Sequence, residues 1–573
     1  MRKYFPSVGA SLDLIASVGY IVLYFLNYHV DQEPKAWMSK SLPILVFIAP
    51  VLVCLSSFFS YSKFESFIDF LRNKVHLFIV IPAFFIVWGD LEFTFWLMIF
   101  HVISSMVFQY VQALESRLED QLQYRVGLLE KIKLNPAQLV ILTFIGLIIF
   151  GAMLISLPFA HVEGFELSYI DAFFMSTSAA CVTGLSPFSI GENFTIIGQV
   201  FMLFLIQVGG LGIMTLTTSM TILLGKSFGM KEQVLMKGLL DISSFEELID
   251  MIIEIIKLTL LIESWGAILL TAAFVYEGQD LGEAMFNGIF HSVSAFCNAG
   301  FALFSNSLID YQSNYFVNTV IMILILLGGL GFFVMKDIKV NLYRKLRFKN
   351  LTLHSKIVLY TNLILVLVGS FSFFFSEFLN TLDSYSIFDK VIISLFQSVT
   401  TRTAGFNTID FTNLHLHTIY FMCILMFIGA SPGSTGGGLK TTTFAILAQS
   451  VKATLQGRSE VEFFNRRIPN SLYIRSVALF MIAMCVFTVF FIILLKVEPN
   501  LPFGSLFFET VSAFGTVGLS LGITAEFSPL GKFFIILLMF IGRVGPFTLV
   551  LAFNQMKTLP SRVQYSEGRV MIG

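Results

Sequence analysis

Residues 181–185 read CVTGL, and a glycine followed by a large apolar residue recurs in three later stretches, CNAGF at 297–301, RTAGF at 402–406 and GTVGL at 515–519. The four glycines are 116, 105 and 113 residues apart. Matching residues precede each glycine by ten and by six positions: Phe174, Phe290, Leu395 and Phe508, and then Ser178, Ser294, Val399 and Ser512. Recurrence at a nearly constant spacing indicates that one structural unit is repeated four times.

The composition around these repeats is that of a membrane protein. Of the 573 residues, 56% are hydrophobic and 13% are charged, and the mean hydropathy is +0.82. A soluble core cannot bury that much apolar surface. Runs such as 137–157 and 196–224 reach the roughly 20 apolar residues that cross a bilayer, where backbone hydrogen bonds must close within each segment. The predicted fold class is therefore an all-α membrane protein.

Charge and cysteine content exclude several other classes. The net charge of −1 provides no basic surface for a nucleic acid, so we expect no nucleic-acid partner. The cysteines lack the spacing of metal ligands and lie mostly in apolar surroundings, so we expect neither zinc nor disulfides; they are Cys54, Cys181, Cys297, Cys423 and Cys485. The first apolar run, residues 12–28, lacks a small-residue cleavage pattern and is predicted to be a retained helix.

Basic residues between the apolar segments predict the orientation in the membrane. By the positive-inside rule, the segments that carry them are cytoplasmic; they include Lys226, Lys231, the stretch 336–349, Arg458, Arg466, Arg467, Lys557 and Arg562. The alternate loops then face outward, near residues 165–190, 280–305, 383–410 and 500–525. These loops are too short and too rich in Gly, Ser and Thr to span, which is typical of re-entrant segments buried in protein.

A repeated glycine in such loops suits an ion filter. A cation gives up its water only where oxygen dipoles replace it, and rings of backbone carbonyls do this for potassium. Presenting successive carbonyls to one axis requires backbone angles that glycine tolerates. The short helix before each loop would point its negative C-terminal end, about half an elementary charge, toward the cation. The predicted architecture is four pseudo-symmetric helix, pore loop and helix repeats around a central pore.

Two segments resemble the Trk/Ktr/HKT superfamily of potassium and sodium transporters: TRTAGF at 401–406 and ASPGSTGGGLKTT at 430–442. With the other three loops in order, the resemblance covers about residues 134–560. It implies a potassium-binding filter, with potassium the only bound metal and no other cofactor in this chain. The implied filter residues are Cys181, Val182, Thr183, Gly184, Cys297, Asn298, Ala299, Gly300, Arg402, Thr403, Ala404, Gly405, Gly515, Thr516, Val517 and Gly518.

The resemblance also implies ion preference, partners and location. Members with glycine at all four filter positions prefer potassium, and Gly184 fits that pattern. The family implies a homodimer with two pores in the bacterial plasma membrane, regulated by a cytosolic nucleotide-binding subunit that docks on basic loops and on the tail at 568–573. The chain itself carries no dinucleotide fingerprint, so nucleotide sensing is assigned to that partner.

Gly and Pro residues interrupt an expected helix between Leu416 and Leu447. Such a break at membrane depth is tolerated where it lines a water-filled cavity, and by resemblance residues 429–438 are the gating loop. A cytoplasmic turn between two short helices is the alternative, whereas a phosphate-binding loop is disfavoured because no strand precedes it. The predicted gate residues are Gly429, Ser431, Pro432, Gly433, Gly436, Gly437, Gly438, Lys440 and Arg543.

Several polar residues within apolar segments have more than one interpretation. Arg543 holds the gating loop closed, repels cations, or is satisfied by carbonyls at a helix break. Lys440 lies at the inner mouth or extends to cytoplasmic water. Glu509 is predicted to pair with Arg402 behind the filter, and Asn298 to reach the ion or a neighbouring loop.

Two further features are interpreted as packing. His291 is predicted to be a packed, hydrogen-bonded histidine rather than a proton carrier. The glycine runs at 209–212 and 328–331, like Gly542 and Gly545, are predicted to allow close helix packing, with a hinge as the alternative.

The predicted domains follow the repeats. Residues 1–133 form an N-terminal extension with about four further helices, near 12–28, 42–59, 75–88 and 93–111. The repeats occupy 134–230, 231–350, 351–455 and 456–573, the last with a cytoplasmic tail. A transporter of organic solutes is disfavoured because all four glycine loops face outward rather than forming inverted repeats. An enzyme is disfavoured because no catalytic constellation occurs in the loops. Passive conduction and sodium- or proton-coupled symport both remain open.

Overall fold

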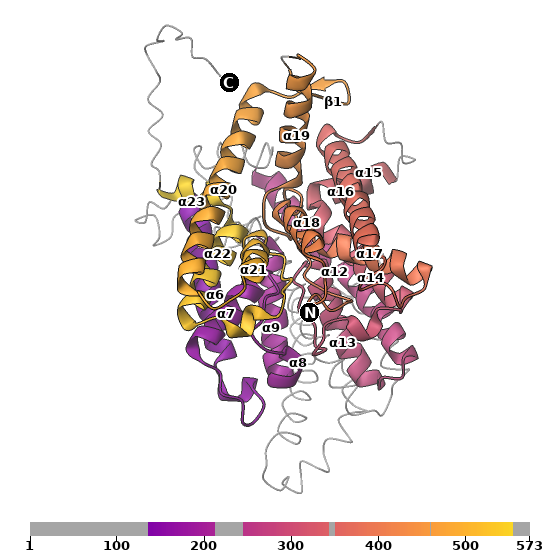
Figure 1. Ribbon diagram of the computed structural model, residues 1–573, viewed down its shortest axis with the longest axis vertical. Helices are drawn as coiled ribbons and strands as arrows, with labels where there is room; N and C mark the ends of the chain where they lie inside the picture. The colour runs from indigo at the N-terminus through magenta and orange to yellow at the C-terminus, as the bar shows by residue number, and fades with distance from the viewer. Residues whose placement is uncertain (1–135, 213–244, 343–349, 459, 554–573) are drawn as a thin grey trace, which may run out of the picture. The chain divides into compact units, whose positions relative to one another are not determined.

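The computed structural model describes residues 136–212, 245–342, 350–458 and 460–553. The predicted helices within 1–133 and the tail at 568–573 lie outside these residues. The described part is almost entirely helical, apart from a single two-stranded hairpin between α19 and α20 (Figure 1). This confirms the all-α class for the described residues.

Four stretches of the described chain share one order of elements: a long helix, a short buried helix, and a second helix that stops or breaks at its C-terminal end. The first contains α6 (Pro136–Ile155), η2 (Pro158–Ala160), α7 (Tyr169–Ala180), α8 (Ile190–Asn193) and α9 (Ile196–Gly210). The second contains α12 (Phe245–Tyr276), α13 (Leu281–Phe296), η3 (Ile309–Tyr311), α14 (Tyr315–Leu330) and α15 (Phe332–Leu342). The third contains α16 (Leu353–Glu377), α17 (Ile387–Thr400), α18 (Leu416–Phe427) and α19 (Thr441–Leu455). The hairpin of β1 (Glu462–Phe463) and β2 (Arg466–Arg467) precedes the fourth, which contains α20 (Asn470–Val497), α21 (Phe503–Gly515), η5 (Ile523–Glu526), α22 (Pro529–Val544) and α23 (Pro546–Phe553).

Among the described helices, α12 from Ile253 to Tyr276, α16 and α20 are each long and apolar enough to cross a bilayer. The pair α14 and α15 meets the same test as one span, but it bends by 102° at Gly331. α9 ends at Gly210, and the part of the apolar run 196–224 that follows residue 212 lies outside the described residues. The described residues divide into two compact units, one of which contains 267–289.

Local sequence starts several of these helices. Ser168 and Ser386 each accept a hydrogen bond at the start of the short helix that follows, from the backbone N–H of Asp171 and Asp389. These caps satisfy N–H groups that have no partner inside the helix. Hydrogen bonds from the hydroxyls of Ser386 and Tyr315 also hold the pKa of the Asp389 carboxyl below its usual value. The Tyr315 bond, 2.7 Å long, joins α14 to α17.

Three of the short helices dock on their long helices through a serine and a glycine. In each case the serine hydroxyl donates 2.7 Å to a carbonyl of the long helix, and a Cβ on the facing glycine would collide with that hydroxyl. The three pairs are Ser176 with Gly151, Ser292 with Gly266 and Ser398 with Gly369. Glycine therefore sets how closely each short helix approaches.

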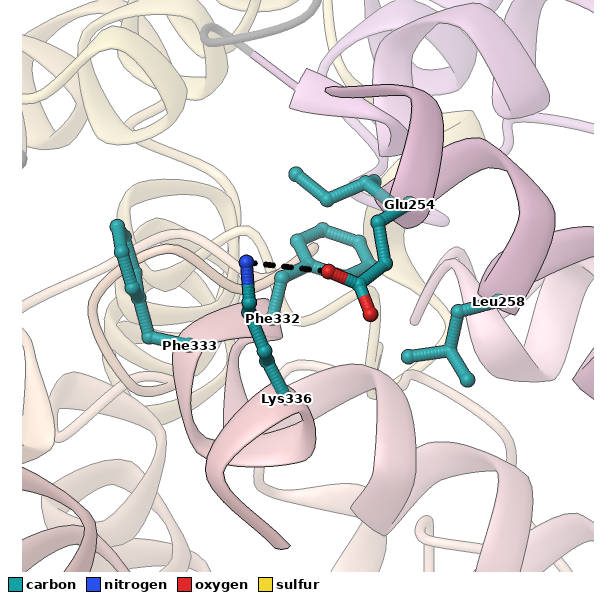
Figure 2. Close-up of a pocket in the computed structure, with 6 residues that line it drawn as sticks. Glu254, Leu258, Phe332, Phe333 and Lys336 are labelled. Carbon is teal, nitrogen blue, oxygen red and sulfur yellow. Dashed lines mark ion pairs between the residues drawn. The ribbon is translucent and has the colours of Figure 1, made fainter. Parts of the chain in front are cut away.

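An ion-pair cluster joins α15 to the first part of α12. Lys336 and Lys339 each lie 3.1 Å from the Glu254 carboxylate, and Figure 2 shows Lys336 directed at that carboxylate beside Phe332 and Phe333. Both lysine side chains are nearly half exposed. The cavity here measures about 10 Å³, room for about one water molecule. This corner is therefore a surface contact rather than a ligand site.

Replacing Glu254 with glutamine is expected to lower the free energy of unfolding by no more than about 1 kcal/mol, because exposed ion pairs contribute about that much or less. The difference from wild type should vanish near 1 M salt, where the screening length falls to about 3 Å. Thermal unfolding of the detergent-solubilised protein at low and high salt measures both effects. A larger loss that persists at high salt would mean that the cluster is not an ordinary surface contact.

Candidate functional site

The four repeated glycines meet in a closed ring. A Cβ built on each glycine would lie no more than 2.5 Å from the carbonyl oxygen that precedes the glycine of the next loop. Gly184 faces Ala299, Gly300 faces Ala404, Gly405 faces Val517 and Gly518 faces Thr183. The last contact returns to the first loop, so loops more than 300 residues apart in sequence share one small space. No side chain fits at these four positions.

The backbone of the ring is held in an unusual conformation. The glycines have φ angles of +91°, +70°, +83° and +92°, a region that favours glycine. Two positions earlier, Val182, Asn298, Thr403 and Thr516 have φ angles of +55°, +58°, +69° and +50°. A non-glycine residue in this region costs of order 1–3 kcal/mol and persists only where its surroundings impose it. The same strain at four matching positions indicates a backbone shaped for function.

Hydroxyl groups on the short helices support three of the loops. Ser178 donates 2.7 Å to the carbonyl of Leu185, Ser294 donates 2.8 Å to that of Phe301, and Thr400 donates 2.6 Å to that of Phe406. In the fourth loop the hydroxyl acts as an acceptor instead, because Gly518 N–H donates 3.1 Å to Ser512. Each loop is therefore fixed to the end of its own helix.

In the third repeat, the aromatic and hydroxyl positions lie one residue closer to the ring glycine than in the other three. Sequence analysis matched Leu395 and Val399 to the aromatic and serine positions, and this is wrong: Phe396 and Thr400 occupy them. Phe396 is fully buried, as Phe174 is, whereas Leu395 is half-buried. Counting back a fixed number of residues fails here because Phe396 precedes Gly405 by nine positions rather than ten, and Thr400 precedes it by five rather than six.

The burial of Phe396 predicts how much stability its side chain contributes. Phe396→Ala is expected to lower the free energy of unfolding by about 3–5 kcal/mol, the usual cost of removing a buried aromatic side chain. Leu395→Ala is the matched control and should cost much less, because Leu395 is only half-buried. Thermal unfolding in detergent compares the two variants. Equal losses would restore the alignment that the sequence suggested.

A cavity of about 410 Å³ opens on one side of the ring. All four ring glycines line it, together with polar residues such as Asn306 and Asn407. Asp410 is the only charged residue among the described residues that line this cavity. A single negative charge in a polar vestibule favours the approach of cations.

The predicted gating loop lies against the other side of the ring. α18 and α19 are separated by residues 428–440, which confirms that glycine and proline interrupt this helix. The Gly437 N–H donates 3.1 Å to the Thr516 hydroxyl, and a Cβ on Gly436 would collide with the hydroxyl of Thr403. The Thr435 hydroxyl donates 3.3 Å to the carbonyl of Phe296, at the end of α13. The loop therefore touches elements that carry three of the four ring loops.

Hydrogen bonds also tie this loop to the breaks in neighbouring helices. The N–H groups of Ser431 and Thr435 donate 3.1 and 3.3 Å to the carbonyls of Gly329 and Gly328, near the end of α14. The Phe332 N–H, at the start of α15, donates 3.0 Å to the carbonyl of Gly433. A plain cytoplasmic turn would lack this set of partners.

Two positively charged side chains, Arg543 and Lys440, donate hydrogen bonds to the same loop. The Arg543 guanidinium donates to the carbonyls of Thr435, in the loop, and Gly209, near the end of α9. The Lys440 ammonium donates 2.7 Å to the carbonyl of Gly436. Arg543 is buried, and the two terminal nitrogens of its guanidinium donate to the loop and to a carbonyl at a helix break. Lys440 is bound to the loop rather than extended into cytoplasmic water.

The recurring glycine runs allow close packing at their first part and end or bend a helix at their last glycine. Gly209, Gly328 and Gly542 lie directly against carbonyls of the short helices, in agreement with the close-packing interpretation. Three positions later, Gly212, Gly331 and Gly545 have φ angles of +82°, +92° and +86° and lie where their helices end or bend.

The predicted pair of Glu509 and Arg402 is not formed. Glu509 accepts a hydrogen bond from Thr524, and Arg402 donates 2.5 Å to the carbonyl of Leu425. Asn298 does reach a neighbouring loop, because its amide donates 3.1 Å to the carbonyl of Arg402. His291 accepts a bond of 3.4 Å from the Leu303 N–H and stacks on Phe304, as a packed histidine should.

Membrane-length helices, some of them broken, and a closed ring of backbone carbonyls define a class: a helical membrane protein in which four loops meet at one backbone ring among the described residues. The chain belongs to the TrkH family of cation transport proteins, which matches residues 154–565. This is a family of membrane transporters and not of enzymes.

Individual relatives agree with this assignment. The chain is 39% identical over 445 residues to Ktr system potassium uptake protein B of Bacillus subtilis (strain 168), covering 77% of this chain and 98% of that protein. It is 36% identical over 447 residues to the potassium/sodium uptake protein NtpJ of Enterococcus hirae, covering 77% and 98%. The crystal structure of the potassium transporter TrkH from Vibrio parahaemolyticus matches with a TM-score of 0.57 at 19% identity, covering 97% of this chain and 98% of that one. At that identity the structural match bears on the fold alone.

Proposed function

We propose that this chain takes up potassium across the bacterial plasma membrane through a pore at the centre of four pseudo-symmetric repeats. The observation that carries the proposal is the closed ring, in which the carbonyls of Thr183, Ala299, Ala404 and Val517 each face a glycine of the neighbouring loop. Carbonyl rings replace the hydration shell of potassium. The names of relatives, which describe potassium uptake, support the choice of ion.

The remaining filter atoms in this proposal are the carbonyls of the other residues in the four loops, at 181–184, 297–300, 402–405 and 515–518. The short helices α7, α13, α17 and α21 end at these loops. Their C-terminal dipoles favour a cation at the ring, each with about half an elementary charge. Glycine at 184 favours potassium over sodium in this scheme.

The gate in this proposal is the loop at 429–438, with Lys440 and Arg543. The loop contacts Thr516 and lies against Thr403, both in the ring loops, so in this position it blocks the inner exit. Conduction requires the loop to leave. The bonds from Arg543 to the loop and to α9 stabilise the closed arrangement.

The proposed assembly is a homodimer that works with a cytosolic nucleotide-binding subunit. The basic residues Arg458, Arg466 and Arg467 at the α19–α20 hairpin are exposed and would lie on the cytoplasmic side by the positive-inside rule. The same rule puts the C-terminus in the cytoplasm.

Potassium and sodium uptake into proteoliposomes that contain the full chain tests the proposal. Potassium flux that follows its electrochemical gradient, independent of pH and sodium, is the expected result. A requirement for a sodium or proton gradient would favour the second candidate, a coupled symporter, which the potassium/sodium name of the Enterococcus relative supports. Absence of any cation flux would overturn both.

A further inference from the structure

A buried carboxylate lies behind the second ring loop. Glu263, on α12, is 5% exposed. One carboxylate oxygen accepts a hydrogen bond of 3.1 Å from the Gln207 amide on α9, and the other lies 3.8 Å from the Cys297 thiol. Burying a carboxylate in a membrane segment is costly, so such residues are functional more often than not. Glu263 is not part of the filter or gate described above.

The contacts of Glu263 lead directly to the ring. Cys297 immediately precedes the strained residue Asn298, whose amide binds the carbonyl of Arg402 in the third loop. On its other side, Cys297 fills the space beside Gly210, where a Cβ would collide with the thiol. Glu263 therefore braces the second loop against α9, and through Asn298 it bears on the third loop.

Only the second loop has this brace among the three that share a serine contact. The serine hydroxyls of the first three short helices bind the carbonyls of Ile148, Glu263 and Val366, so these residues occupy matching places on their long helices. Two of the three are aliphatic. The side chain of Glu263 has two oxygens, so it can receive the Gln207 amide on one and the Cys297 thiol on the other.

We propose that Glu263 is a positioning residue for ion selectivity, holding the second filter loop in the geometry that favours potassium over sodium. This inference rests on the proposed function. The residue need not touch the ion. It acts through Cys297 and Asn298, because discrimination by a carbonyl ring depends on cavity size and dipole placement.

The decisive variants exchange the two partners. In Glu263→Gln, the new amide oxygen can still accept from Gln207, but the new amide N–H2 group faces the Cys297 thiol, so that contact loses its acceptor. We expect the potassium-to-sodium flux ratio to fall about fivefold, the effect of one lost hydrogen bond. Adding Gln207→Glu restores a carboxylate and an amide at the same site and should return the ratio to within about twofold of wild type. Glu192→Gln, an exposed residue on α8, is the matched control and should leave the ratio unchanged.

Proteoliposome flux in potassium and sodium, with thermal unfolding measured in parallel, gives the result. If Glu263→Gln does not fold, Gln207→Ala retains Glu263, removes one donor and should lower the ratio similarly. A wild-type ratio in the folded single variants, or failure of the exchange to restore it, would overturn the role of Glu263 while leaving the proposed function intact. A wild type without potassium preference would overturn the proposed function itself.

Discussion

Replacing Gly184 with serine is expected to lower the preference for potassium over sodium at least tenfold, a difference of about 1.4 kcal/mol. The added Cβ would collide with the Ala299 carbonyl oxygen, which belongs to the neighbouring loop. Gly184 also has a φ of +91°, where a side chain adds about 1–2 kcal/mol of strain. The ring must shift to relieve both effects, and its carbonyls then no longer surround one cation evenly. Competitive uptake of the two ions into proteoliposomes measures the change.

Gly164→Ser is the matched control. Gly164 has a similar φ of +87°, but a Cβ there would meet nothing within 4 Å. The control therefore introduces comparable backbone strain away from the ring, and it should retain the wild-type selectivity. If Gly184→Ser also kept that selectivity, Gly184 would not belong to the filter.

Removing the guanidinium of Arg543 is expected to raise basal potassium flux at least tenfold. Arg543 donates to Thr435 in the loop and to Gly209 on α9, and hydrogen bonds from charged groups contribute about 1.5–3 kcal/mol each. If the open state lacks these bonds, Arg543→Ala destabilises only the closed state. A shift of about 1.4 kcal/mol already changes the open population tenfold. Potassium flux into proteoliposomes that contain the chain without any cytosolic partner measures this open population.

Arg543→Lys distinguishes the effect of the positive charge from that of the two hydrogen bonds to Thr435 and Gly209. Lysine keeps the positive charge but lacks the planar fork that reaches two carbonyls at once. We therefore expect Arg543→Lys to leak, although less than Arg543→Ala. If flux through Arg543→Lys were as low as in wild type, Arg543 would act as an electrostatic barrier and not through hydrogen bonds that join the loop to α9. Wild-type flux in both variants would remove Arg543 from the gate.

The sequence predicted the helical class and the four glycines that meet at the ring. Glycine at a nearly constant spacing carries that information because the backbone angle at each of the four positions excludes other residues. The break between α18 and α19 was predictable from composition, since one proline and five glycines fall within residues 429–438 and together disfavour a helix there. Both predictions rest on local backbone preferences, which do not depend on how distant parts of the chain pack.

What the sequence missed depends on distances across the fold. Counting residues matched Leu395 to Phe174, but the third repeat has one residue fewer between its aromatic position and its glycine, so Phe396 takes that place. Opposite charge suggested that Glu509 pairs with Arg402, yet each has a nearer partner on another element. The brace from Glu263 to Cys297 joins residues 34 positions apart through side-chain contacts that no periodic pattern encodes.

The most direct measurement is an experimental structure of the full chain in rubidium or thallium, heavy substitutes for potassium, compared with the same protein in sodium. The account predicts heavy-ion density at the centre of the ring, surrounded by the carbonyls of Thr183, Ala299, Ala404 and Val517, and weaker density there in sodium. Heavy-ion density elsewhere in the chain, with an empty ring both in the heavy ion and in sodium, would contradict the proposed filter.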